Sequence, residues 1–124
     1  MAHILVIDDD TDIRKLVETI LTKAGHKVSL AADGESGLGF AMLKKPDLII
    51  LDLNLPKMNG FEVCRRLKKD EATRKIPVIM LTAAYDEWED AKKGFELGAD
   101  EYVIKPFASE LLLHNIERLL KNRT

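Results

Sequence analysis

Short apolar runs alternate along this chain with longer segments in which apolar residues recur at helical spacing. The runs have the length of buried strands: Ile4–Ile7, Val28–Ala31, Leu48–Leu51, Val78–Leu81 and Tyr102–Ile104. Strands that alternate with helices favour a parallel sheet with right-handed crossovers and helices on both faces. The pattern therefore predicts an α/β fold, a doubly wound sheet of five parallel strands flanked by five helices.

The helical segments carry their own start and stop signals. After the first run, apolar residues repeat every three or four positions at Ile13, Leu16, Val17, Ile20, Leu21 and Ala24. Asp10 or Thr11 is expected to cap this helix, and Gly25 to end it. The other helices are expected from Asp33-Gly34 to Leu43, after Gly60, from about Asp86 to Leu97, and after a cap at Ser109. No repeat or linker interrupts the pattern, so residues 1–124 are expected to form a single domain.

Composition adds limits to this picture. The 124 residues are 46% hydrophobic and 32% charged, which is typical of a globular domain with its own core. The formal net charge is −2, with both signs spread along the chain, so direct binding of nucleic acid is not expected. The chain has neither a long apolar run nor a signal-peptide pattern, which argues against a membrane partner. The single cysteine, Cys64, indicates a reducing, cytoplasmic location.

Polar side chains follow four of the five predicted strands directly. Asp8 and Asp9 come after the first strand, and Asp52, Thr82 and Lys105 come after the third, fourth and fifth. The carboxyl ends of parallel strands meet at one edge of the sheet, which is where open α/β sheets bind ligands. These five side chains are therefore expected to converge.

Three converging carboxylates repel one another and need compensation. At about 4–5 Å each pair costs roughly 1 kcal/mol in water, and about 4 kcal/mol at an effective dielectric constant of about 20. A divalent cation or a raised pKa on one carboxyl compensates, and ligands that are all oxygen favour a hard ion such as Mg²⁺. With Lys105 and Thr82 near the metal, one carboxylate is placed to act as a nucleophile in phosphoryl transfer.

Four segments in order carry a resemblance to a known family. They are Ile7-Asp-Asp-Asp10, Leu51-Asp-Leu-Asn-Leu-Pro56 with Gly60, Leu81-Thr-Ala-Ala84, and Gly98-Ala-Asp-Glu-Tyr-Val-Ile-Lys-Pro-Phe107. Over essentially its whole length the chain resembles the receiver domain of two-component response regulators, including chemotaxis regulators. The resemblance implies a flavodoxin-like sheet with strand order 2-1-3-4-5.

The resemblance also implies roles at matching positions. Asp52 would be the phosphoacceptor. Asp8 and Asp9 would hold Mg²⁺ (or Mn²⁺) together with a carboxylate oxygen of Asp52 and the backbone carbonyl of Asn54.

A second group of residues would respond to phosphorylation. Lys105 would contact the phosphoryl group, and Thr82 would move toward it after transfer. Tyr102 would be the aromatic switch residue whose rotamer reports the position of Thr82. The peptide bond between Lys105 and Pro106 is expected to be cis, as family members usually have it.

The partners implied are those of a signalling module. A sensor histidine kinase or a phosphotransfer protein would donate the phosphoryl group, and an unknown output domain or protein would respond at the face of the fourth helix, fifth strand and fifth helix. The chain would catalyse its own phosphorylation and dephosphorylation without being a conventional enzyme. A phosphorylation-dependent homodimer is a further candidate. Asn115 and Glu117 stand where dimerising relatives tend to carry basic residues, which argues against their salt-bridged dimer.

Two other functions compete with this interpretation. A phosphatase of the haloacid dehalogenase type would place phosphate on Asp8, because Asp8-Asp9-Asp10-Thr11 faintly imitates its first motif. A flavodoxin-like cofactor binder is disfavoured, because the acidic turn after the first strand would repel a cofactor phosphate. Trp88 has two open interpretations. It shares a helical stripe with Phe95, which favours burial, yet its neighbours are acidic, which favours an exposed partner anchor.

Overall fold

The computed structural model describes residues 2–83 and 87–122. Its strands lie in one parallel sheet in the order β2-β1-β3-β4-β5, as predicted. They are β1 (His3–Ile7), β2 (Lys27–Ala31), β3 (Leu48–Asp52), β4 (Val78–Ala83) and β5 (Glu101–Lys105). Every predicted strand is present, and each is one or two residues longer than its apolar run.

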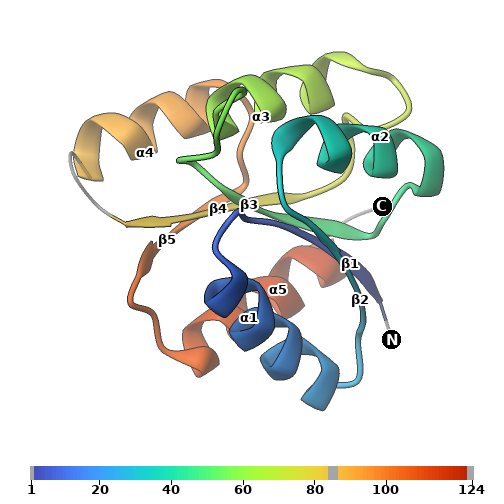
Figure 1. The fold of residues 1–124 in the computed structure, drawn as a ribbon, viewed down its shortest axis with the longest axis vertical. Helices are drawn as coiled ribbons and strands as arrows, with labels where there is room; N and C mark the ends of the chain where they lie inside the picture. The colour runs from blue at the N-terminus through green and yellow to red at the C-terminus, as the bar shows by residue number, and fades with distance from the viewer. Residues whose placement is uncertain (1, 84–86, 123–124) are drawn as a thin grey trace.

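Five helices cover the two faces of this sheet (Figure 1). They are α1 (Thr11–Lys23), α2 (Gly34–Lys44), α3 (Gly60–Lys69), α4 (Glu87–Glu96) and α5 (Ser109–Asn122). Helices α1 and α5 lie on one face, and α2, α3 and α4 lie on the other. The doubly wound, flavodoxin-like architecture is therefore confirmed.

The helices begin and end largely where the sequence predicts. Asp10 caps α1, since its side chain accepts hydrogen bonds from the backbone N–H groups of Asp12 and Ile13. Gly25 and Gly98 adopt positive φ angles of 93° and 102°, which glycine tolerates and which end α1 and α4. The cap predicted at Ser109 is wrong by one residue. Helix α5 already includes Ser109, and the backbone carbonyl of Ala108 accepts the first helical bonds.

The core has two layers, one on each side of the sheet. Strand β3 is buried along its whole length, as its apolar run predicts for a central strand. Helix α1 contributes Val17 and Leu21, both fully buried. Leu16, predicted on the same inner face, is 49% exposed because the buried stripe centres on Val17 and Leu21.

Among the described residues, no helix has the length and apolar character needed to span a bilayer. The side chain of Trp88 lies outside the part of the chain that the structure describes, so both interpretations of this residue stay predictions.

Candidate functional site

The polar residues singled out in the sequence all lie at the carboxyl edge of the sheet. Asp8 and Asp9 directly follow β1, whereas Asp52 and Lys105 are the last residues of β3 and β5. Thr82 is one residue from the end of β4. The register keeps these positions level, because Asp52 pairs with Leu81 and Thr82 pairs with Ile104.

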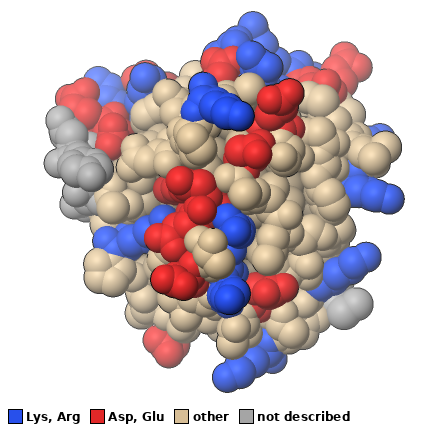
Figure 2. Space-filling model, viewed as in Figure 1, with Lys and Arg blue, Asp and Glu red and all other residues tan. Residues whose placement is uncertain are grey.

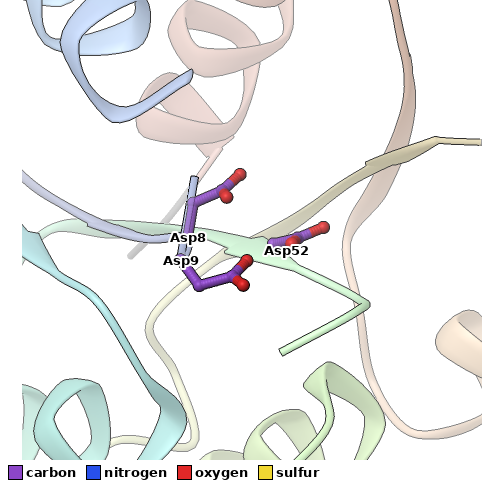
Figure 3. Close-up of side chains that lie close together, drawn as sticks. All are labelled: Asp8, Asp9 and Asp52. Carbon is purple, nitrogen blue, oxygen red and sulfur yellow. The ribbon is translucent and has the colours of Figure 1, made fainter. Parts of the chain in front are cut away.

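Three carboxylates meet at this edge. Asp8, Asp9 and Asp52 each offer an oxygen within 4.8 Å of the others, and their side chains converge from the ends of two strands (Figure 3). Asp8 is 1% exposed and Asp52 is 5% exposed, while Asp9 is open to solvent. Acidic side chains gather in the middle of this face, with basic side chains beside them (Figure 2). The predicted convergence is confirmed for the three carboxylates.

Lys105 supplies the nearest positive charge. Its Nζ lies 2.9 Å from Oδ2 of Asp8 and 3.6 Å from Oδ1 of Asp52. The first distance is a charge-assisted hydrogen bond, whereas the second is only an ion-pair contact. Asp8 also accepts a hydrogen bond from the backbone N–H of Asp10 at 2.9 Å. Asp8 is therefore better compensated than Asp52.

The pKa of the Asp52 carboxyl is raised, in keeping with this weaker compensation. Burial is the largest cause that raises its pKa above the ordinary value, and the negative charge of Asp8 adds to it. Lys105 and a hydrogen bond from the backbone of Asn54 oppose the rise without cancelling it. A raised pKa is one of the two compensations that repulsion between the carboxylates was expected to require.

The other compensation is a cation, and the donor set fits one. The three clustered ligand residues offer only carboxylate oxygens, which hard divalent ions prefer. Two of the three side chains are already buried, so their desolvation is part of folding and is not repeated on binding. The cluster is compatible with a divalent metal ion.

Thr82 and Tyr102 belong to the two strands β4 and β5, Thr82 near the carboxyl end of its strand and Tyr102 near the amino end of its own. The Thr82 hydroxyl is buried, with the Ala83 carbonyl and the Asn54 side-chain amide each 3.4 Å away, at the limit of hydrogen bonding. Tyr102 has a buried hydroxyl and packs against the core layer beneath α2, α3 and α4. The Lys105–Pro106 peptide bond is cis, as predicted.

The loop after β3 is held tightly against the site. A Cβ atom at Gly60 would lie 2.4 Å from the backbone oxygen of Asp52, so only glycine fits without displacement. The Gly60 N–H donates to the carbonyl of Leu53 at 2.8 Å, and Asn59 caps α3 through the N–H of Glu62. These contacts fix the backbone that carries Asp52.

One residue near the site was missed at the sequence level. Arg14, in the first turns of α1, donates from Nη1 to the backbone carbonyl of Asp8 at 2.7 Å. This contact holds the turn between β1 and α1. Its only sequence signal is the position of Arg14 one helical turn after the Asp10 cap, and that spacing is also typical of a solvent-exposed residue.

Comparison with known proteins identifies the family. Residues 4–117 match the response regulator receiver domain. The chain belongs to this family. A receiver domain is a phosphoacceptor signalling domain.

Relatives in sequence and in structure agree with this assignment. The chain is 49% identical over 121 residues to the DNA-binding dual master transcriptional regulator RpaA of Synechocystis, covering 98% of this chain and 50% of that protein. It is 45% identical over 121 residues to the transcriptional regulatory protein AfsQ1 of Streptomyces coelicolor, covering 98% of this chain and 52% of that one. The chain therefore spans about half the length of these curated relatives.

Two solved structures show how closely the fold is shared. The chemotaxis protein CheY4 of Vibrio cholerae superposes with a TM-score of 0.88 at 35% identity, covering 96% of this chain and 98% of that one. The receiver domain of a signal transduction histidine kinase from Syntrophus aciditrophicus gives 0.91 at 34% identity, covering 100% and 95%. The receiver fold thus occurs in proteins of different overall organisation.

Proposed function

We propose that Asp52 accepts the phosphoryl group in this receiver domain. The donor is the phosphohistidine of a sensor histidine kinase or of a phosphotransfer protein. A carboxylate oxygen of Asp52 forms the new bond to phosphorus while the bond from phosphorus to the imidazole nitrogen breaks, and the imidazole keeps that electron pair. The observation that supports this assignment is the position of Asp52, buried at the sheet edge within 4.8 Å of Asp8 and Asp9 and in ion-pair contact with Lys105.

Asp8, Asp9, Asp52 and the backbone carbonyl of Asn54 would hold Mg²⁺, or Mn²⁺ in its place. The ion supplies charge neutralisation for the phosphoryl oxygens, which is the main requirement of phosphoryl transfer. The carboxylate cluster supports this proposal through its all-oxygen donor set. The tight approach of Gly60 to the backbone of Asp52 keeps the nucleophile and the neighbouring ligands in one arrangement.

Lys105 and Thr82 would contact the phosphoryl group after its transfer to Asp52. Lys105 exchanges part of its contact with Asp8 for a phosphoryl oxygen, and the Thr82 hydroxyl turns to donate to another. Within the part of the chain that the structure describes, the Thr82 hydroxyl gives up two long, weak contacts, which favours this change. Tyr102 would follow the movement of Thr82 and change the surface formed by α4, β5 and α5, so that phosphorylation alters affinity for an output domain or protein.

The structure bears on the form of any homodimer. Asn115 is buried, and Arg118 pairs within the chain with Glu101 at 2.7 Å. Asn115 and Arg118 are thus already buried or paired within the chain. This supports the proposal that a phosphorylation-dependent dimer of this chain does not use the salt bridges that dimerising relatives form on the face of α4, β5 and α5. We also infer that residues 1–124 act as a single receiver domain, since all five strands share one sheet.

The experiment that tests the site is phosphorylation with acetyl phosphate and Mg²⁺, followed by mapping of the modified residue by mass spectrometry. We expect the phosphoryl group on Asp52 and a loss of modification in Asp52→Asn. Asp12→Asn is the matched control, because Asp12 is an exposed acid in the first turn of α1. Modification of Asp8 instead of Asp52 would overturn the assignment of the phosphoacceptor, and so would the absence of modification at either residue.

A further inference from the structure

A second charged site lies at the opposite edge of the sheet. A cleft of about 390 Å³ is bounded by the end of α3, the segment entering β4, the turn before β5 and the end of α5. Its lining includes Lys68, Arg74, Lys75, Pro77, Asp100 and Leu119. Strands β4 and β5 begin at this cleft and end at the edge that carries Asp8, Asp9 and Asp52, called the acid cluster below. The cleft and the acid cluster therefore lie at opposite ends of the same two strands.

One wall of the cleft is a satisfied ion pair. The Lys68 ammonium donates to Asp100 at 3.3 Å and to the backbone carbonyls of Arg74 and Ile76 at 3.3 Å and 2.8 Å. Asp100 also accepts from the backbone N–H of Val78 at 2.8 Å. These contacts hold the segment before β4 and neutralise the acidic residue of the cleft.

Two cations remain after this pairing. Arg74 and Lys75 are both exposed, and within residues 2–83 and 87–122 their side chains make no hydrogen bond or ion pair. Since Asp100 is balanced by Lys68, the cleft carries a net positive charge on a chain whose formal net charge is −2. Pro77 and Leu119, both largely buried, add apolar surface to the lining of the cleft.

We infer that this cleft binds a short acidic segment of a partner protein. Carboxylates of the segment would pair with Arg74 and Lys75, and an apolar side chain would lie against Pro77 and Leu119. Nucleic acid fits less well, because protein–DNA affinity normally rests on several phosphate contacts and the cleft offers two uncommitted cations. The inference is independent of phosphorylation at Asp52, because it rests on residues at the other edge of the sheet.

The test is a titration with a fluorescein-labelled octapeptide of glutamate residues with one central leucine, followed by fluorescence anisotropy at low ionic strength. We expect saturable binding that weakens as salt is raised to about 0.5 M. The Arg74→Ala/Lys75→Ala variant should bind at least about fivefold more weakly, as expected for the loss of two partly exposed ion pairs. Amide shifts in two-dimensional NMR should fall on residues 74–78 and 100, away from the acid cluster.

A matched variant separates the cleft from general charge attraction. Lys15→Ala/Lys69→Ala removes the same two charges from exposed positions on α1 and α3 that do not line the cleft, so it should bind like the parent protein. Equal weakening in both double variants would overturn the proposal, and so would the absence of saturable binding. Tighter binding of a DNA duplex at the same residues would assign the cleft to a nucleic-acid backbone and would overturn it as well.

Discussion

At the scale of single residues, the three carboxylates of the cluster are not equivalent. Asp8 is buried but has a close ammonium and a backbone N–H as partners. Asp9 is exposed, so water screens its charge. Asp52 is buried, its contact with the Lys105 ammonium is a longer 3.6 Å, and its pKa is raised even though the backbone of Asn54 donates to it. The proposed phosphoacceptor is thus the least compensated of the three.

Replacing this charge should stabilise the metal-free protein. We expect Asp52→Asn to raise the free energy of unfolding by about 1–2 kcal/mol at pH 7 in the presence of a chelator. The pKa is higher in the folded than in the unfolded state, so the folded parent protein binds more protons between the ordinary value of 3.8 and the raised one. Parent stability therefore falls as pH rises through that window.

Urea denaturation of both proteins across this window measures the effect. The advantage of Asp52→Asn should be absent below the ordinary pKa, grow as pH rises, and be constant above the raised pKa. An advantage that is equal at every pH would mean that the substitution acts through packing or hydrogen bonding and not through charge.

A second residue-scale prediction concerns Cys64. This thiol is fully buried in α3, and burial is the largest cause that raises its pKa to about 11. The thiolate is the reactive form, so a disulfide reagent at pH 8 should label the native protein only through transient opening. The same reagent should label the urea-unfolded chain promptly. Fast labelling of the native protein would show that α3 does not shield the thiol.

At the scale of elements, the apolar runs predicted the existence, type and order along the chain of all five strands. Their ends were predicted less well, because the terminal residues of β3, β4 and β5 are polar site residues or exposed positions. Asp52, Thr82 and Lys105 are therefore part of their strands and not the residues after them. Periodicity detects buried positions, and these side chains are placed by the sheet register instead.

The sequence pattern does not predict ion pairs between elements that are far apart along the chain. The pairing of Lys68 with Asp100 and that of Arg118 with Glu101 join α3 and α5 to the start of β5. Both basic residues look like ordinary solvated helix positions in the sequence, since charge alone does not specify a partner. Only the folded arrangement shows which of these charges are neutralised.

Glycine positions give an element-scale prediction with an internal control. Gly60→Ala should destabilise the protein by about 2–3 kcal/mol and slow phosphorylation of Asp52, because the added Cβ would collide with the Asp52 backbone oxygen. Gly39→Ala, in α2 with open space around the new Cβ, should stabilise by about 0.5–1 kcal/mol. Thermal melts and acetyl phosphate kinetics measure both. Equal effects of the two variants would contradict the close approach at Gly60.

At the scale of the whole molecule, β4 and β5 connect two sites of opposite charge. The acid cluster is at their carboxyl ends, and the basic cleft is at their amino ends. Both sites exist only in the folded chain, because each collects residues from several elements. A ligand at either site should therefore stabilise the whole domain by mass action and not one element of it.

The final prediction applies this linkage to the metal. Mg²⁺ at about a hundred times its dissociation constant should add about 2.7 kcal/mol to the free energy of unfolding, which corresponds to a rise of several degrees in the melting temperature. Asp9→Asn should melt at the same temperature as the parent or slightly above it in a chelator, since it removes a repulsive but exposed charge. Because Asp9→Asn lacks one of the proposed metal ligands, Mg²⁺ should raise its melting temperature much less than that of the parent protein.

Asp12→Asn is the control for this measurement, because it removes an exposed acid of α1 that lies outside the cluster. It should lose a little stability, since an acid near a helix N-terminus is favourable, and should keep the full response to Mg²⁺. If Mg²⁺ leaves the parent melting temperature unchanged, the converged carboxylates do not form a metal site. If Mg²⁺ raises the melting temperature of Asp9→Asn as much as that of Asp12→Asn, Asp9 is not a ligand. Asp8 and Asp52 would then have to hold the ion without it.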